Sequence, residues 1–345
     1  MDNRRRTEDF TEMLETPVHS PGPGPLSYFF QCLEDQFIRT EPRAHAYNYL
    51  CDLLAIPGQR AGRERHVGGG EDGRNRLLTT AQWDEDAVRD RVRDLVVENF
   101  GMRDSYLILA EDGFVKKGKT SAGVGRQYCE SSGRVDNYQI GLFLLYADRT
   151  GNAAAIDREL LLSPCWSENP VGRRRAGIPG REQLYSRELS ALAMVERALD
   201  RSVPASWVIA DAPYYGDSGS FREALERRRM PYVLASNSAG PPVAKEDTRD
   251  GFVRWRLARG GGGSYLCYAP SWTGLSDLIP AASQGHVVRS HFVSARAEAG
   301  LARYSVRKWR AWYRHMTLAM FAHAVLRVTQ PPARSPHSGT LCGHV

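Results

Sequence analysis

The chain has 345 residues, a hydrophobic fraction of 42% and a formal charge of +6 at pH 7. This length predicts a sizeable core and at least two structural units, and the small positive excess favours a polyanionic partner. The six cysteines lie singly, without CxxC or Cys/His ligand spacing, which argues against a zinc site or a disulfide framework. No apolar run of about 18 residues is present, so we expect a cytoplasmic protein with no membrane insertion.

Residues 1–26 end in alternating proline and glycine, which predicts a flexible arm. Residues 27–100 predict a helical domain, because apolar side chains recur in them at three- and four-residue spacing. Within this domain, the segment 57–74 is rich in glycine and charge and predicts a flexible loop. A further helix is expected from about residue 84 to the end of the domain.

The stretch that organises the rest of the chain begins at Ser105. It predicts a buried strand that ends in the acids Glu111 and Asp112, followed by a tight turn at Gly113 and then by two lysines. A metal-dependent phosphoryl-transfer site is often built in this way. An ordinary strand, turn and strand with a solvated charged turn fits the same residues, and this stretch alone does not separate the two interpretations.

Alternating strands and helices follow. Strands are expected over 124–128, 138–146 and 152–162, and a second buried strand, 206–211, ends in Asp211. A strand over 231–235 and short strand-like pieces over 252–257 and 265–268 are also expected, as are helices over 182–199, 220–229 and 309–328. The succession predicts an α/β (α+β) fold, with a mixed sheet flanked by helices. The remaining domain assignments are a core of residues 101–236 and 285–328, a small insertion of residues 237–284, and a disordered tail of residues 329–345.

Several short motifs occur in an order that is typical of one family. They are Gly113-Phe-Val-Lys-Lys-Gly118, Gly125-Arg-Gln-Tyr128, Gly133-Arg-Val-Asp-Asn-Tyr-Gln139, Arg158-Glu-Leu160, Trp207-Val-Ile-Ala-Asp211 with Tyr215-Gly-Asp217, and Gly300-Leu301 to Arg307 with Trp312-Tyr-Arg-His315. Over roughly residues 40 to 328 the chain resembles the DDE transposases of bacterial insertion sequences, and more narrowly their IS701-type branch. The resemblance implies a ribonuclease-H-like fold.

The resemblance also implies a chemistry, in which three carboxylates hold two divalent metals that activate the attacking oxygen and stabilise the leaving one. The position of the first acid is Ala110 here, the second acid matches Asp211, and the position of the third falls on Arg289 and Ser290. Asp112, two residues beyond Ala110 on the strand, could return to the same face, whereas Glu111 would point to the other face. We therefore expect no metal cofactor; Mg²⁺ or Mn²⁺ bound by Asp211 and Asp112 would accompany any residual nuclease activity.

Two functional hypotheses remain open. In the first, a transposase-derived protein has a degenerate active site and has lost strand transfer but still binds DNA or another polyanion. The residues expected to contact phosphates are Lys116, Lys117, Arg126, Arg134, Arg187 and Arg307.

In the second hypothesis, the cleft has been repurposed as a metal-independent acid/base enzyme, a cyclase, dehydratase or isomerase, that acts on a small-molecule substrate. Asp112, Asp211, Glu111 and His291 would then act as acids and bases, and Arg289 would hold an anion. A homodimer is compatible with both hypotheses.

Overall fold

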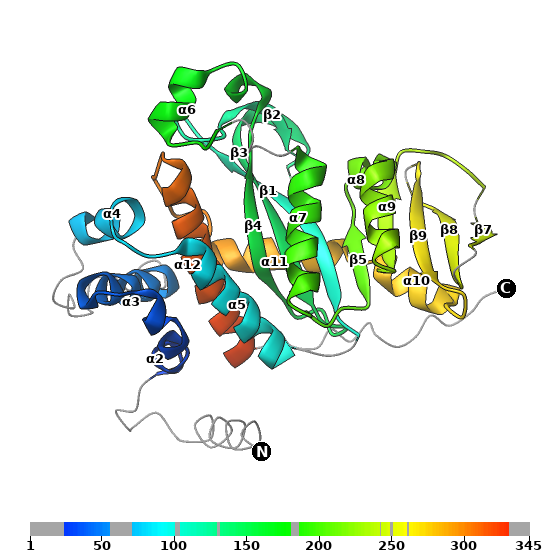
Figure 1. Ribbon diagram of the computed structural model, residues 1–345, viewed down its shortest axis with the longest axis horizontal. Helices are drawn as coiled ribbons and strands as arrows, with labels where there is room; N and C mark the ends of the chain where they lie inside the picture. Colours follow the sequence, from blue (N-terminus) through cyan, green and yellow to red (C-terminus); the bar gives the residue numbers. More distant parts are fainter. Residues whose placement is uncertain are drawn as a thin grey trace.

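The computed structural model describes residues 24–55, 71–100, 104–129, 132–180, 186–241, 243–248, 251–260 and 262–330. A long mixed sheet runs through the molecule, with a group of helices at one end and three outer strands at the other (Figure 1). The fold class predicted from the sequence, a mixed sheet flanked by helices, is confirmed. Within the described residues, no helix is both long and apolar enough to cross a membrane.

The helical end contains the N-terminal elements α2 (Pro25–Phe30), η1 (Gln31–Gln36), α3 (Thr40–Leu54), α4 (Glu71–Thr79) and α5 (Glu85–Phe100). Asp84 caps α5, because its carboxylate accepts hydrogen bonds from the backbone N–H groups of Asp86 and Ala87, at 2.8 and 3.1 Å. The C-terminal helix α12 (Trp309–Thr329) packs against α3, α4 and α5 and is buried along most of its length. The first and last parts of the chain therefore share one core.

The structure limits or corrects three of the segments predicted from the sequence. The loop predicted over residues 57–74 is wrong for its last four residues, where α4 begins at Glu71 and gains its stability by burying Leu77 and Leu78. The predicted arm lies outside the described residues except for residues 24–26, and α2 already begins at Pro25. Residues 331–345 of the predicted tail also lie outside them.

The sheet has the strand order β2-β3-β1-β5-β6-β9-β8-β7, and β4 pairs with β3 beside β2. Its central strand β1 (Tyr106–Val115) runs antiparallel to β3 (Arg134–Ala147) and parallel to β5 (Trp207–Ala210). The other strands of this half are β2 (Gly125–Cys129), β4 (Ala153–Leu161) and β6 (Tyr232–Ser236). All of these strands were predicted from the sequence, to within a few residues at their ends.

The predicted turn at Gly113 is wrong. The strand β1 continues through Glu111, Asp112 and Gly113 to Val115, and Gly113 pairs with Ile140 of β3. A Cβ atom at position 113 would lie 2.2 Å from the Sγ of Cys129 on β2, so the glycine leaves room for that side chain. The carboxylates consequently project from the middle of a long strand instead of from its end.

The segment 237–284, predicted as a small insertion, continues the sheet. It forms β7 (Val243–Asp247), β8 (Phe252–Ala258), β9 (Ser264–Pro270) and α10 (Leu275–Ala282), and β9 pairs antiparallel with β6. Strand β7 and helix α10 were not predicted. Lys245, Glu246 and Asp247 occupy an edge strand, where both faces carry polar residues and the alternation of apolar side chains is lost.

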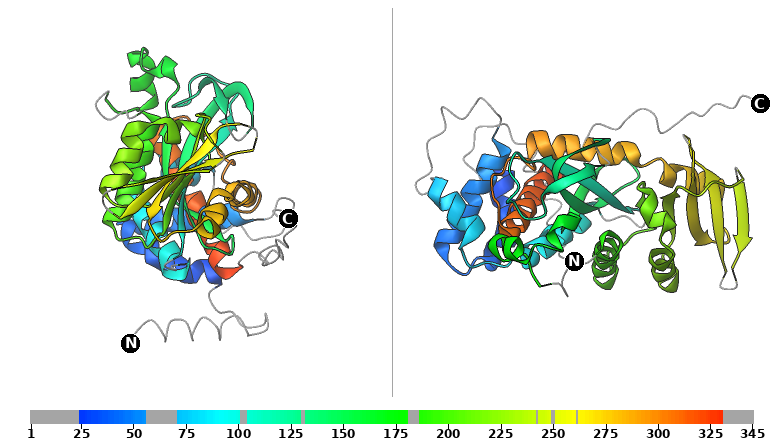
Figure 2. Two further views of the ribbon diagram at one scale, coloured as in Figure 1. Left: turned by 90° about the vertical axis from the view of Figure 1, so that its right-hand side faces the viewer. Right: turned by 90° about the horizontal axis from the view of Figure 1, so that it is seen from above.

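Helices cover both faces of the sheet. Helix α11 (Gly285–Glu298) crosses one face, and α7 (Arg187–Asp200) and α9 (Gly219–Arg227) cover the other (Figure 2). The short elements η2 (Pro164–Trp166), α6 (Pro170–Ala176) and α8 (Pro213–Asp217) connect them. We call the two sides of the sheet the α11 face and the α7 face.

Candidate functional site

Successive residues of β1 point to opposite faces of the sheet. The carboxylate of Asp112 contacts a residue of α11, and that of Glu111 contacts residues of α7 and α8. Ala110, two residues before Asp112, therefore lies on the α11 face, and its partner on β3 is Phe143, whose ring contacts Phe292 of α11. The predicted division between Ala110 and Asp112 on one side and Glu111 on the other is confirmed.

On the α11 face, Asp112 is held by Arg296 in a bidentate salt bridge. Nε and Nη2 of Arg296 donate to the two carboxylate oxygens of Asp112 at 2.9 and 2.7 Å. Nη2 also donates to the carbonyl oxygen of Gly113, at 2.9 Å, and the guanidinium lies over the ring of Phe114. The side chain of Asp112 is only 4% exposed, so a charge-assisted pair in a partly desolvated position neutralises it.

On the α7 face, Glu111 is held by a cation and two phenols. Nε of Arg187 lies 2.8 Å from its carboxylate, and the hydroxyls of Tyr214 and Tyr215 donate to it. Burial and the carboxylate together raise the pKa of Tyr214 above its usual range, so this phenol stays a donor. Although burial opposes its charge, the neighbouring Glu111 raises the pKa of Arg187.

Asp211 follows β5 directly and is half-exposed. Its carboxylate accepts a hydrogen bond from the hydroxyl of Tyr265, at 3.0 Å, and lies 3.4 Å from Nη2 of Arg259. Both partners belong to the segment predicted as an insertion. Asp211 also faces the first turn of α11, since a Cβ atom at Gly285 would lie 3.2 Å from its Oδ2 and 3.6 Å from Nη1 of Arg289. The structure thus brings Asp211 and Arg289 together.

His291 lies apart from these acids. It is buried in the core, 5% exposed, where its Nδ1 is 3.4 Å from the carbonyl oxygen of Ala153 and its ring contacts His323 of α12. Burial lowers the pKa of His291 to about 4. The structure therefore does not place His291 beside Asp211 and Asp112.

Among the described residues, no group of three or more His, Cys, Asp or Glu side chains is arranged to hold a metal ion. Asp112 and Asp211 are the two carboxylates on the side of β1 and β5 where the family chemistry would place metals. Each of them already has an arginine partner.

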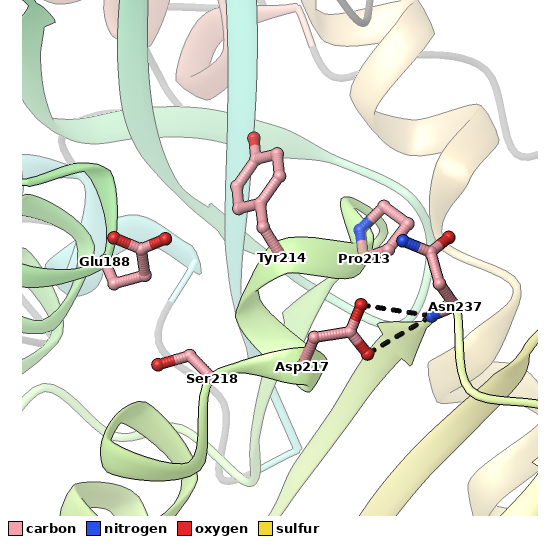
Figure 3. A pocket seen from close by; sticks show the side chains of 6 residues that line it. All are labelled: Glu188, Pro213, Tyr214, Asp217, Ser218 and Asn237. Atoms are coloured by element: carbon pink, nitrogen blue, oxygen red, sulfur yellow. Dashed lines mark hydrogen bonds between the residues drawn. The ribbon is translucent and has the colours of Figure 1, made fainter.

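A polar cavity of about 600 Å³ opens beside α8 (Figure 3). Asp217 accepts hydrogen bonds there from the backbone N–H of Asn237, at 3.2 Å, and from the hydroxyl of Ser236. The cavity is also lined by Glu188, Pro213, Tyr214 and Ser218, and neither Asp112 nor Asp211 lines it. This cavity is therefore separate from Asp112 and Asp211, whereas Tyr214, one of its lining residues, donates to Glu111.

Most of the predicted phosphate contacts gather at one end of the sheet, formed by the segments 116–129, 132–137, 164–180 and 307–308. Hydrogen bonds join these segments: Ala122 N–H donates to the carbonyl of Arg307, Trp166 Nε1 to the carbonyl of Val124, and Lys308 Nζ to the carbonyl of Arg175. We call this region the cationic end. Figure 1 shows α6, β2 and the start of α12 side by side there.

The cationic end contains ten basic residues and, among its described residues, only two acids, Asp136 and Glu168. The basic residues are Lys116, Lys117, Lys119, Arg126, Arg134, Arg173, Arg174, Arg175, Arg307 and Lys308. In the described part of the chain, none of these ten makes an ion pair, whereas Arg89, Arg93 and Arg197 on the helices α5 and α7 all do.

Arg187 and Lys116 differ from the other predicted phosphate contacts. Arg187 lies outside the cationic end and is occupied by Glu111. Nζ of Lys116 lies 3.4 Å above the ring centroid of Tyr304, and burial lowers the pKa of this lysine to about 8. The other predicted contacts, Lys117, Arg126 and Arg307, are exposed, and Arg134 donates to the hydroxyl of Tyr138.

The residues that sequence reasoning missed are the partners of the acids. Arg296 is 184 residues from Asp112 along the chain, and Arg259 and Tyr265 are about 50 residues from Asp211. No local pattern marks such pairs. The one available signal was the helical spacing of Arg289 and Arg296, which are seven residues apart and therefore share a face of α11.

Comparisons with known proteins agree with the resemblance. A family model described as DDE superfamily endonuclease matches residues 29–241. A probable transposase for insertion sequence element IS701 from Microchaete diplosiphon is 27% identical over 169 residues; this region is 49% of the chain but only 41% of that relative.

Two solved structures are also similar. A piggyBac transposase synaptic complex with hairpin DNA aligns with 90% of this chain and 67% of its own, with a TM-score of 0.42 and 11% identity. The Mos1 strand transfer complex aligns with 69% and 67%, with a TM-score of 0.20 and 14% identity. Because the family model matches more than half of its residues, the chain belongs to the DDE superfamily of endonucleases.

Proposed function

We propose that this chain is a transposase-derived protein that binds nucleic acid through its cationic end but does not carry out two-metal strand transfer. The observation that carries the proposal is the state of Asp112. It is the one acid of β1 on the α11 face, and Arg296 occupies both of its oxygens. A divalent metal would have to displace that guanidinium from a position that is nearly closed to water.

The other two positions of the family site support the same conclusion. Ala110 offers no ligand at the position of the first acid, and Arg289 places a cation at the position of the third. Asp211 is the remaining acid, and Arg259 and the hydroxyl of Tyr265 contact its carboxylate. A metal ion bound there would be repelled by nearby positive charge, so the residues present do not fit a pair of divalent metals.

Nucleic-acid binding is supported by the cationic end. Its ten basic residues outnumber its two described acids, and none of the ten makes an ion pair within the described residues. Such a concentration attracts phosphates by releasing counterions. For the opposing hypothesis of a metal-independent acid/base enzyme, the cavity in Figure 3 offers only Tyr214, which donates to Glu111, and neither Asp112 nor Asp211 lines it.

The test is a titration of labelled duplex DNA with the full chain at several salt concentrations, with fluorescence anisotropy as the readout of binding. We expect the logarithm of the association constant to fall linearly with the logarithm of the salt concentration. Removal of each cation that contacts a phosphate should reduce the magnitude of this slope by about 0.9. Lys117→Ala, Arg126→Ala and Arg307→Ala test the cationic end. Arg227→Ala, an exposed arginine at the end of α9, is the matched control.

The same preparations are assayed for nicking and strand transfer with Mg²⁺ and Mn²⁺. Binding without a steep salt slope, or equal effects of the test and control variants, would count against nucleic-acid binding at this end. Metal-dependent nicking by the chain as it stands would overturn the second half of the proposal.

A further inference from the structure

The outer hairpin of the cationic end carries an exposed aromatic side chain. Tyr128 on β2 is 52% exposed, and the residue directly opposite it on β3, Val135, is 53% exposed. Arg126 lies two residues before Tyr128 on the same face of β2 and is also exposed. A large aromatic ring that stays in solvent beside an unpaired cation is typical of surfaces on which nucleic-acid bases stack.

Hydrogen bonds hold the strands β2 and β3 to each other and to the end of β1. The side-chain amide of Gln127 donates to the carbonyl oxygen of Tyr138, at 3.0 Å, and the hydroxyl of Tyr138 lies within hydrogen-bond distance of Ser132 and Arg134. Asn137 donates to the carbonyl oxygen of Lys116. Because these bonds hold the backbone on which Tyr128 stands, the strand itself loses little conformational freedom when the ring binds a ligand.

The exposed ring shares a face with the candidate site. In the ladder between β2 and β3, Tyr128 pairs with Val135; in the ladder between β1 and β3, Ala110 pairs with Phe143. Residues 135 and 143 are an even number of positions apart on β3, so Tyr128 and Ala110 both lie on the α11 face. The separation of eight residues corresponds to about 27 Å along the strand.

Basic side chains lie along the chain that leads to this ring. Lys117 and Lys119 are exposed in the segment between β1 and β2, and Arg126 follows at the start of β2. None of these three makes an ion pair within the described residues. They can contact successive phosphates of a strand that continues from the ring.

We propose that Tyr128 is a stacking site for an unpaired base of a DNA strand, whose phosphates are held by the neighbouring basic residues. The inference rests on the proposed function and deepens it, because it states that the cationic end takes single-stranded DNA in preference to duplex. In a duplex the base faces are already stacked on one another, so the ring gains a base contact only where a base is unpaired.

A purely structural role for this ring makes a different prediction. Tyr128 and Val135 form a cross-strand pair, and such pairs stabilise a hairpin. If that were their only role, truncation of either side chain would disturb the hairpin to a similar extent. Stacking, in contrast, requires the aromatic ring of Tyr128 and does not require its hydroxyl or the side chain of Val135.

The experiment compares Tyr128→Ala, Tyr128→Phe and Val135→Ala in the full chain. The probes are a single strand of about 16 nucleotides, twice the number that covers 27 Å at a rise of 3.4 Å, and the corresponding duplex. Tyr128→Ala is expected to weaken single-strand binding by about 5- to 150-fold, the range of base stacking, and to leave the salt slope unchanged. Tyr128→Phe and Val135→Ala should bind the single strand as the parent does.

A second readout follows the base itself. With 2-aminopurine in the single strand, the parent chain and Tyr128→Phe should quench its fluorescence, and Tyr128→Ala should not. Equal binding and quenching by the parent and Tyr128→Ala, or equal losses in Tyr128→Ala and Val135→Ala, would overturn the stacking site and leave the proposed function standing. A lack of salt-dependent binding to either probe would overturn the proposed function itself.

Discussion

Replacement of Arg296 by glutamine is the perturbation that the structure describes most fully. The guanidinium makes two hydrogen bonds to Asp112, at 2.9 and 2.7 Å, and one to the carbonyl of Gly113, at 2.9 Å. Asp112 is 4% exposed and Arg296 is 36% exposed. Removal of one partner of a fully buried pair costs about 3–5 kcal/mol; because Arg296 is partly solvated, we expect a smaller loss, of about 2–3 kcal/mol.

The assay is equilibrium unfolding in urea, with tryptophan fluorescence as the readout. The matched control is Arg74→Gln, which breaks an arginine–carboxylate pair with Asp52 in which the two side chains are 44% and 52% exposed. We expect the control to cost less than about 1 kcal/mol. A double-mutant cycle with Asp112→Asn should give a coupling energy of about 2 kcal/mol between the two side chains.

The reasoning would be refuted if Arg296→Gln lowered the free energy of unfolding no more than Arg74→Gln did, or if the cycle gave no coupling. Either result would mean that the salt bridge does not hold Asp112 in the folded protein. The carboxylate would then be available to a metal, contrary to the proposed function.

Three further predictions concern other parts of the chain. Burial lowers the pKa of His291 and of His315 to about 4, below the value of about 6.5 in an unfolded chain. Because the unfolded state binds more protons between these two pH values, the free energy of unfolding should fall by about 2 kcal/mol per histidine from pH 7 to pH 5. A lower urea midpoint at pH 5 than at pH 7 would show this loss, and equal midpoints would contradict it. Lys116, with a pKa of about 8, should be about half neutral at pH 8, and mass spectrometry should find it acetylated by an amine-reactive ester ahead of the exposed lysines; equal labelling would contradict its burial. Gly216→Ala would place a Cβ atom 2.1 Å from the carbonyl oxygen of Ala235 and should cost about 3 kcal/mol or more, so an unchanged melting temperature would contradict the close packing of α8 on β6.

The central strands and the last helix could be predicted because their signals are local. Strand β5 is a short apolar run, and α12 shows helical spacing of large side chains over five turns. The opposite directions of Glu111 and Asp112 follow from strand geometry alone. The same local reasoning failed at Gly113, because the reason for the glycine is Cys129, a side chain that reaches it only when β2 and β3 pair with β1.

The closure of the candidate site could not be predicted for a similar reason. The family pattern indicates which acids are replaced, but not that Arg296 and Arg259 contact the acids that remain. Both contacts depend on how α11 and the outer strands pack on the sheet. The burial of His291 likewise depends on His323 and α12, which are far from it in the sequence.

The central claim is that arginines, and not metal ions, balance the acids of this site. Electron paramagnetic resonance of Mn²⁺ titrated into the full chain tests it directly, because bound manganese loses its sharp solution signal. We predict that the signal grows as it does in buffer alone, with no tight site. Two manganese ions bound per chain, lost together in Asp112→Asn or Asp211→Asn, would contradict the claim.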